Sequence, residues 1–326
     1  MSMVFLTRTE VQSLITMEEA VDAVEAAFGA WGRNEVQMPP KSYLIYDGHD
    51  GDLRSMPAYI PSSGATGVKI VTVHPNNPEI DLPTVMALTV LNDPKTGLPV
   101  AVMDATHLTA VRTGAGGAVA SAWLAIPQAE EVGLVGAGVQ ARYQIEAHFC
   151  VRDIKRVVLF DPRREACESL AEWIADIRPG VDVEIGNLKE ACDTDIIITT
   201  TPARQPVVWD QDIVRPHTHL NGIGADAEGK QEVDPLFLMR AHLVVDDWTQ
   251  ASHSGEINLP LAQELISRED IIAELGVLVA NEDRSLQKEL TLFDSTGLAI
   301  QDMATAQIVA IRAKERGIGL PLDPLS

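Results

Sequence analysis

Apolar side chains first recur along the chain at the spacing of a helix. Val21, Val24 and Phe28 would share one helical face. Thr16, followed three residues later by Glu19, forms a capping box at the expected start of this helix. The pattern therefore predicts an N-terminal helix with one buried face.

Between Pro39 and Met103 the pattern changes to short apolar runs of β type. The expected strands are Ser42–Tyr46, Leu53–Ile60, Val68–Val73, Thr84–Leu91 and Pro99–Met103. Turn sequences such as Asp47-Gly48 separate them. Consecutive strands joined by turns predict a mostly antiparallel sheet.

A long helix rich in alanine and glycine is expected from Thr106 to Leu124. Its central run, Thr113-Gly114-Ala115-Gly116-Gly117-Ala118, has poor helix propensity. Glycines at such positions allow a ligand or another backbone to come close. Plain close packing of two helices is an equally good interpretation.

After Pro127 strands and helices alternate. Helices are expected at Gln140–Cys150 and Arg163–Ile177, and strands at Val132–Gly136, Arg156–Phe160, Asp195–Thr200, Thr218–Ile223, Leu243–Asp246 and Thr291–Phe293. This alternation predicts a parallel sheet covered on both faces. The fold class is therefore α/β, with a doubly wound parallel sheet and a second, α+β domain.

The last helix, expected from Leu298 to Ala313, would leave the parallel sheet and pack on the N-terminal domain. That domain would then be discontinuous, comprising residues 1–125 with 299–326, and the parallel-sheet domain would span 126–298. A chain of 326 residues is long enough for two domains.

A glycine motif marks the start of the second domain. Gly136-Ala137-Gly138-Val139-Gln140-Ala141 has the form G-x-G-x-x-A and lies between an apolar strand and a helix. Gly136 permits a tight turn, and Gly138 lets the backbone approach a pyrophosphate at the positive end of the helix. The motif predicts a Rossmann domain that binds a dinucleotide.

The next expected strand ends in Asp161, where an acidic residue binds the adenosine ribose. An aspartate repels a 2′-phosphate, which favours NAD over NADP, although Arg163 and Arg164 soften that preference. Alternatively, Asp161 only caps the next helix. The residues expected from these patterns to bind the cofactor are Gly136, Gly138, Val139, Gln140, Asp161, Arg163, Thr200 and Thr201.

Composition narrows the choice of partners. The 47 acidic and 25 basic residues give a net charge of −22, which disfavours nucleic acid and anionic membranes. The chain lacks a run of about 18 apolar residues and a signal-peptide pattern, so we expect a cytoplasmic protein. Cys150, Cys167 and Cys192 fit neither a disulfide framework nor a zinc site, and the histidines lack ligand spacing, so we expect no metal.

Three charged side chains need a chemical explanation. Lys69 lies in the apolar run Val68–Val71, where a lysine is costly to bury without a partner. Asp226 follows a strand of the parallel sheet, near the expected cofactor, and Arg54 has a planar fork suited to a carboxylate. The alternatives are a lysine that extends to solvent, an aspartate in a turn and a structural ion pair.

Segments along nearly the whole chain resemble the ornithine cyclodeaminase/mu-crystallin family. They are Met38–Lys41, Gly51–Pro57, Gly67–Lys69, His74–Pro78, Leu82–Thr84, Met103–Thr106, Arg112–Ala115, the glycine motif and Phe293–Asp302. Ile223–Asp226 and Gly229–Glu232 are similar to the NAD-dependent, archaeal-type alanine dehydrogenase branch, whereas Ala227-Glu228 departs from that branch and from the cyclodeaminases.

The resemblance implies hydride transfer between NAD and the Cα of a small amino or imino acid, and the branch implies L-alanine. Lys69 and Asp226 would be catalytic, and Lys41, Arg54 and Arg112 would bind the substrate carboxylate. Arg112, Thr113 and Ser295 would also contact the cofactor. It also implies a homodimer, with the N-terminal domain and last helix supplying dimer contacts and the substrate pocket. The alternatives are an ornithine cyclodeaminase, a reductase of cyclic imines such as Δ1-pyrroline-2-carboxylate, and a non-enzymatic NAD(P)H-binding protein.

Overall fold

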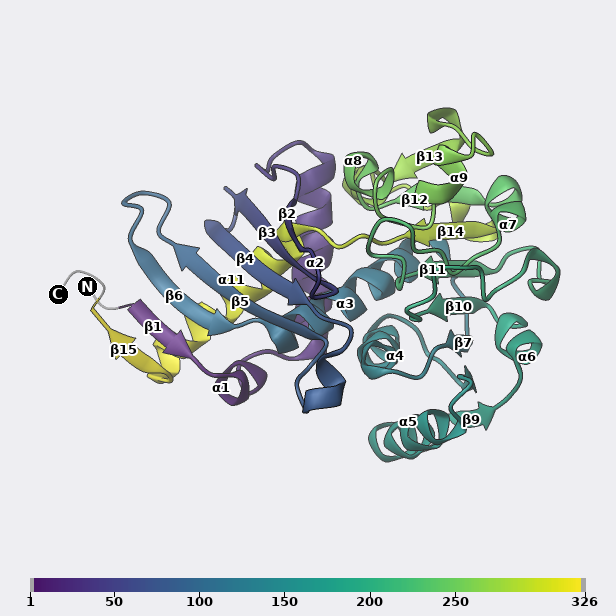
Figure 1. The fold of residues 1–326 in the computed structure, drawn as a ribbon, viewed down its shortest axis with the longest axis horizontal. Helices are drawn as coiled ribbons and strands as arrows, with labels where there is room; N and C mark the ends of the chain where they lie inside the picture. The colour runs from purple at the N-terminus through teal and green to yellow at the C-terminus, as the bar shows by residue number, and fades with distance from the viewer. Residues whose placement is uncertain (1–2, 324–326) are drawn as a thin grey trace. The chain divides into compact units, whose positions relative to one another are not determined.

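A computed structural model describes residues 3–323 of the chain. The chain divides into two units, which Figure 1 shows with their elements labelled. Unit 1 comprises Met1–Arg112 and Leu298–Ser326, and unit 2 comprises Thr113–Gly297. The division falls inside helix α3 (Thr106–Leu124) rather than after residue 125, because the second part of α3 packs within unit 2.

Unit 1 is built on a seven-stranded sheet in the order β15-β1-β6-β5-β4-β3-β2. Its strands are β1 (Met3–Leu6), β2 (Ser42–Tyr46), β3 (Gly51–Ile60), β4 (Ala65–Val73), β5 (Val85–Asn92), β6 (Pro99–Asp104) and β15 (Leu320–Leu322). Strands β2 to β6 pair antiparallel in sequence order, which confirms the predicted sheet. Strands β1 and β15 were not predicted; β1 pairs parallel with β6 and antiparallel with β15.

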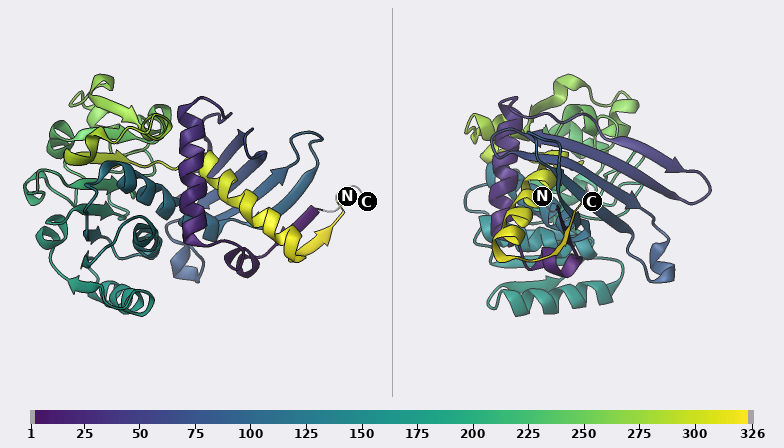
Figure 2. Two further views of the ribbon diagram at one scale, coloured as in Figure 1. Left: turned by 180° about the vertical axis from the view of Figure 1, so that it is seen from behind. Right: turned by 90° about the vertical axis from the view of Figure 1, so that its left-hand side faces the viewer.

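Two long helices cover one face of this sheet, as Figure 2 shows. Helix α2 (Met17–Gly32) begins at the predicted capping box, in which the Thr16 N–H donates to Glu19 Oε2 at 3.0 Å. Helix α11 (Ala299–Arg316) packs against α2 and against strands β3, β4 and β5. Unit 1 also contains α1 (Arg8–Gln12) and the short 3-10 helix η1 (Asn77–Ile80).

Unit 2 contains an eight-stranded, wholly parallel sheet in the order β13-β12-β14-β11-β10-β7-β8-β9, which confirms the predicted Rossmann architecture. The strands are β7 (Glu131–Val135), β8 (Arg156–Phe160), β9 (Asp182–Ile185), β10 (Ile196–Thr199), β11 (His219–Gly222), β12 (His242–Val245), β13 (Ile271–Glu274) and β14 (Thr291–Asp294). The edge strands β9 and β13 were not predicted.

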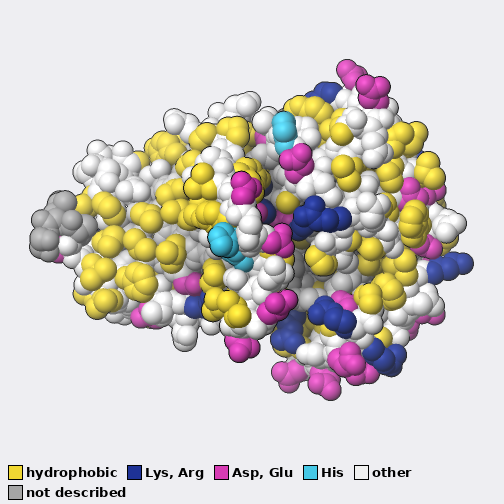
Figure 3. Space-filling view, in the orientation of Figure 1, with side chains coloured by type: hydrophobic (Ala, Val, Ile, Leu, Met, Phe, Trp, Pro, Cys, Tyr) yellow, Lys and Arg dark blue, Asp and Glu magenta, His cyan; other side chains and the backbone are white. Residues whose placement is uncertain are grey.

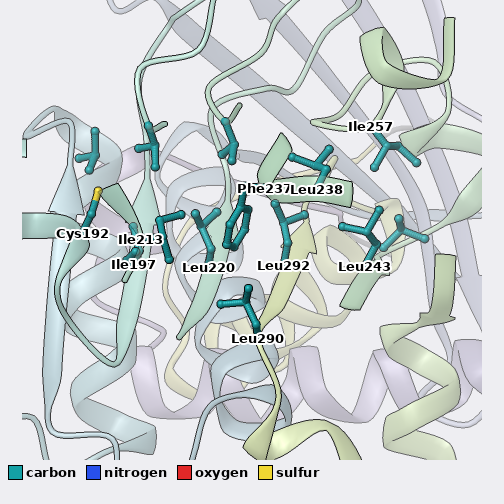
Figure 4. Close-up of a cluster of buried hydrophobic side chains, with 14 of the residues drawn as sticks. Cys192, Ile197, Ile213, Leu220, Phe237, Leu238, Leu243, Ile257, Leu290 and Leu292 are labelled. Atoms are coloured by element: carbon teal, nitrogen blue, oxygen red, sulfur yellow. The ribbon is translucent and has the colours of Figure 1, made fainter. Parts of the chain in front are cut away.

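Helices and apolar side chains complete unit 2. Its helices are α4 (Val139–Val151), α5 (Arg164–Ile177), α6 (Leu188–Cys192), α7 (Pro235–Arg240), α8 (Trp248–Ala251), α9 (Asn258–Ala262), α10 (Leu275–Ala280), η2 (Asp210–Asp212), η3 (Arg268–Asp270) and η4 (Ser285–Lys288). Figure 4 shows part of the core, where Phe237 lies between Leu220 and Leu292 of the central strands, and Ile197 lies further along the same row. No helix among residues 3–323 combines the length and apolar character needed to cross a membrane.

The glycines of α3 let it approach α4 closely. A Cβ on Gly114 would lie 2.3 Å from the carbonyl oxygen of Tyr143, and one on Gly117 would lie 2.3 Å from Gln144 Oε1. Gln144 Nε2 also donates to the Thr113 carbonyl at 3.1 Å. Close packing of two helices therefore accounts for these glycines.

Candidate active site

Lys69 is buried in the middle of β4, with none of its surface exposed. Its Nζ donates to Asp302 Oδ1 at 2.7 Å, and Asp302 lies in the first turn of α11. The next residue, Ile70, is on the opposite face because side chains alternate along a strand. Lys69 is therefore an internal, paired lysine, and the alternative of a lysine extending to solvent is wrong.

Arg112 contacts the same carboxylate. Its Nε donates to Asp302 Oδ1 at 3.0 Å, and its Nη1 donates to Gln301 Oε1 at 3.1 Å. Burial lowers the pKa of Lys69 to about 7, the charges of Arg112 and Lys41 add to this effect, and Asp302 opposes it. Lys69 thus gains and loses its proton near neutral pH, within reach of two other cations.

Arg54 lies on the same sheet face as Lys69. Met56, two residues after Arg54 on β3, pairs directly with Lys69 on β4. Arg54 is therefore a diagonal neighbour of the lysine on that face. The Arg54 Nε and Nη2 donate to the two carboxylate oxygens of Asp52 at 2.8 and 3.1 Å. An ion pair is therefore present at Arg54, and its role toward a substrate carboxylate stays a prediction.

The glycine turn after β7 has the features that a dinucleotide requires. Gly136 adopts a φ of +99°, in the left-handed region that favours glycine. A Cβ on Gly138 would meet nothing within 4 Å, so packing inside the protein does not explain this second glycine. Helix α4 begins at Val139, which is 75% exposed, and its N–H groups favour an anion there. These features fit a pyrophosphate at Gly138.

Asp161 follows β8 and contacts the glycine turn directly. Its Oδ2 accepts the Ala137 N–H at 2.9 Å, and its Oδ1 accepts the Arg163 N–H at 2.8 Å. Burial would raise the pKa of Asp161, but the hydrogen bonds from Arg163 and Ala137 outweigh it and the pKa is lowered. Asp161 is a carboxylate at neutral pH, beside the turn, where a ribose-binding residue is expected.

Several of the predicted cofactor residues follow the carboxyl ends of the parallel strands. Thr200, after β10, donates its hydroxyl to the Gly136 carbonyl at 2.9 Å. Strands β8 and β10 flank β7 on opposite sides, so the turn lies at the topological switch point, where such sheets bind ligands. Ser295, after β14, donates its N–H to the Gly222 carbonyl at 3.0 Å.

Asp226 lies in the loop after β11, at the same edge of the sheet as Thr200. Lys230 Nζ donates to Asp226 Oδ1 at 2.6 Å and lies 3.4 Å from the Gly224 carbonyl oxygen. The Asp226 side chain remains 36% exposed. The sequence interpretation assigned no role to Lys230; in the structure it holds the Asp226 carboxylate by an ion pair.

Two acidic residues escaped the sequence interpretation. Asp302 pairs with Lys69, and the signal for it in the sequence is that a buried Lys69 requires an anionic partner. Glu232 is fully buried among strand ends of unit 2, and the segment Gly229–Glu232 gives no sign of that burial.

The parallel sheet and its glycine turn define an NAD-binding protein of the Rossmann class. Residues 1–317 match the model of the ornithine cyclodeaminase/mu-crystallin family, and the chain belongs to this family. It is 45% identical over 321 residues to the alanine dehydrogenase of Archaeoglobus fulgidus, covering 98% of each chain.

Two solved structures are similar to this one along nearly their full length. An archaeal alanine dehydrogenase dimer with bound NAD has a TM-score of 0.95 and 44% identity, with 100% of both chains covered. The Δ(1)-pyrroline-2-carboxylate reductase of Thermococcus litoralis, in complex with NADH and L-proline, has a TM-score of 0.94 and 35% identity, covering 98% of this chain and 100% of that one.

Proposed function

We propose that this chain is an NAD-dependent alanine dehydrogenase, which converts L-alanine to pyruvate and ammonia and catalyses the reverse reductive amination. The observation that carries the proposal is the buried Lys69, which shares the carboxylate of Asp302 with Arg112. A buried lysine with a pKa of about 7 suits proton and hydrogen-bond chemistry at an oxygen atom. The 45% identity to an alanine dehydrogenase supports alanine as the substrate.

Unit 1 would bind the substrate carboxylate. Lys41 and Arg112 both lie near enough to Lys69 to lower its pKa, and Asp302 is the one carboxylate shared by Lys69 and Arg112. The positive charges of these side chains attract an anionic group. Arg54, on the same face of the sheet, adds a planar fork.

The reaction needs a neutral amine, a hydride acceptor and an activated water. When bound, NAD supplies the hydride acceptor for the Cα hydrogen of alanine. Asp226 takes a proton from the substrate ammonium, releases it to solvent, and then takes a second proton from the water that adds to the resulting iminium carbon. Lys69 donates a hydrogen bond to the oxygen of the carbinolamine. Asp226 then returns this proton to the amino group, which leaves as ammonia while the hydroxyl proton passes to Asp226, and the oxygen remains on Cα as the carbonyl of pyruvate.

The first test is formation of NADH, followed by its absorbance, with purified protein, NAD and L-alanine. A parallel reaction with L-ornithine is assayed for proline, and a third supplies NADH with Δ1-pyrroline-2-carboxylate. Alanine-dependent NADH supports the proposal. Proline formed without net NADH would instead indicate a cyclodeaminase, and NADH consumption only with the cyclic imine would indicate a reductase.

We also propose that unit 1 forms a homodimer through the sheet face that α2 and α11 leave bare. Ile70 on β4 is 40% exposed and Leu88, its direct partner on β5, is 47% exposed. Figure 3 shows hydrophobic side chains gathered over this part of unit 1. Extended apolar surfaces of this kind are typical of protein interfaces.

A further inference from the structure

The carboxylate of Glu232 joins the ends of two strands in unit 2. Its Oε1 accepts the Thr201 N–H at 2.5 Å, and its Oε2 accepts the Gly224 N–H at 2.6 Å and the Thr199 hydroxyl at 2.8 Å. Thr199 and Thr201 lie at the end of β10, and Gly224 lies after β11. One buried side chain therefore fixes the end of one strand to the loop that follows the other.

The backbone around Glu232 leaves room for this arrangement and supports it. A Cβ on Gly224 would lie 2.6 Å from Glu232 Cδ, so a side chain there would displace the carboxylate. The Glu232 N–H donates to Glu256 Oε1 at 3.0 Å, and the Val233 N–H donates to Glu256 Oε2 at 3.1 Å. A second buried carboxyl group thus holds the main chain at Glu232.

The two buried carboxyl groups differ in their hydrogen bonding. Burial raises the pKa of Glu256 well above its ordinary value, and the neighbouring Glu232 and Asp294 raise it further. Burial also raises the pKa of Glu232, but the donors on Thr201, Thr199 and Gly224 oppose that rise. The pKa of Glu232 is therefore raised less than that of Glu256, and Glu232 is the more readily ionised of the two.

The loop held by Glu232 carries Asp226. Gly224 at its start and Glu232 at its end meet through the Glu232 side chain, which closes residues 224–232 into a ring. Within the ring Lys230 pairs with Asp226. Asn258 fixes the ring from outside, accepting the Gly229 N–H at 3.2 Å and donating to the Lys230 carbonyl at 3.1 Å.

We propose that Glu232 is a positioning residue, which holds the Asp226 loop in register with the end of β10. The inference rests on the proposed function, in which Asp226 accepts protons from the substrate and water. A displacement of a reacting group by about 1 Å costs about 100-fold in rate. Loss of the Glu232 carboxylate therefore slows turnover more than it weakens NADH binding, because the carboxylate binds the Asp226 loop directly and reaches the Gly136 turn only indirectly, through Thr200.

The test compares Glu232→Gln with Glu228→Gln, an exposed glutamate of the same loop. In the first variant the amide nitrogen is a donor and faces the N–H of Thr201 or of Gly224. We expect kcat with L-alanine to fall about 100-fold, while the Kd for NADH rises less than about tenfold. Hydrogen–deuterium exchange should become faster in peptides covering 199–204 and 223–231 and stay unchanged elsewhere. Glu228→Gln should match the wild type throughout.

A second variant, Glu232→Asp, keeps the charge on a shorter side chain and should recover part of the lost kcat. Wild-type kcat and wild-type exchange in Glu232→Gln would overturn the inference. Faster exchange along the whole chain would also overturn it, since Glu232 would then only support the fold. If the wild type does not oxidise alanine, the proposed function is contradicted, and the exchange measurement still decides whether Glu232 fixes the loop.

Discussion

At the scale of single residues, a charged residue within an apolar run was the feature of the sequence that best indicated the site. Lys69 stands out among the apolar residues of β4, and the cost of burying a lysine alone predicts that it has a partner. The partner itself could not be predicted, because Asp302 lies 233 residues further along the chain and only the packing of α11 on the sheet brings it to Lys69. The contact between Lys230 and Asp226 could not be predicted for a different reason. The two residues are four apart in a loop, and in a loop this spacing does not indicate that the side chains meet.

The Lys69–Asp302 pair predicts how activity depends on pH. The protonated lysine donates to the substrate oxygen, so kcat/KM for pyruvate should fall as pH rises through about 7, the pKa of Lys69. The negative charge of Asp302 raises that pKa. In Asp302→Asn the pKa of Lys69 is therefore lower, and the decline in kcat/KM should begin at a lower pH than in the wild type.

The measurement is kcat/KM for pyruvate, with saturating NADH and ammonia, across pH 5 to 10 for both proteins. The matched variant Asp302→Glu keeps the charge and should keep the position of the decline better than Asp302→Asn. An unchanged or alkaline-shifted decline in Asp302→Asn would show that this carboxylate does not support the protonated lysine.

Lys69 itself should be needed for the chemical step and not for the cofactor. Its contacts lie in unit 1, and the glycine turn lies in unit 2. Lys69→Ala should therefore reduce kcat/KM with alanine by at least about 100-fold and leave the Kd for NADH unchanged. Steady-state kinetics and NADH fluorescence titration check the two halves of this prediction. Near-wild-type turnover would remove Lys69 from the mechanism.

At the scale of elements, length and burial decided what the sequence could show. The strands of the antiparallel meander and the helix Thr106–Leu124 were predicted nearly to their ends, because each is long and bounded by turn or cap residues. Strands β1, β9, β13 and β15 have three or four residues, lie at or next to a sheet edge and are mostly exposed or half-buried. The equally short strands β10, β11, β12 and β14, which were predicted, are central and almost fully buried. The glycine turn was predictable because its chemistry depends on local sequence alone.

Changing the two glycines of that turn to alanine should affect different properties, NADH affinity at Gly138 and folding stability at Gly136. Gly138 has an ordinary backbone and open space at its Cβ, so Gly138→Ala should keep its thermal stability. Its new methyl group enters the space that we assign to the pyrophosphate, and the Kd for NADH should rise at least about tenfold. Gly136 has a φ of +99°, so Gly136→Ala costs about 1–3 kcal/mol of folding free energy.

Calorimetric titration with NADH and thermal denaturation of both variants separate these effects. Wild-type NADH affinity in a stable Gly138→Ala protein would argue against a pyrophosphate at this turn. A Gly136→Ala protein as stable as the wild type would contradict the strain expected from its backbone.

At the scale of the whole molecule, unit 1 has one sheet face covered by α2 and α11 and one face bare. Both faces carry apolar side chains, since Val68, Ile70 and Leu88 alternate along β4 and β5 with residues that point to the helices. Alternation alone does not say what covers the second face. A second copy of the chain is the occupant that we propose, and it would bury Ile70 and Leu88 together.

This proposal predicts that charge on the bare face separates the subunits without unfolding them. In the double variant Ile70→Glu, Leu88→Gln a charged and a neutral polar group replace exposed, directly paired side chains, so no like charges meet across the strands and unit 1 keeps its fold while the apolar contact is lost. We expect light scattering after size exclusion to give the mass of a dimer for the wild type and of one chain, 35.3 kDa, for the variant. Ile311→Glu is the control, because Ile311 is an exposed apolar side chain on α11 and lies away from this face. A double variant that remains dimeric would place the interface elsewhere, and a wild type that elutes as a single chain would contradict the dimer itself.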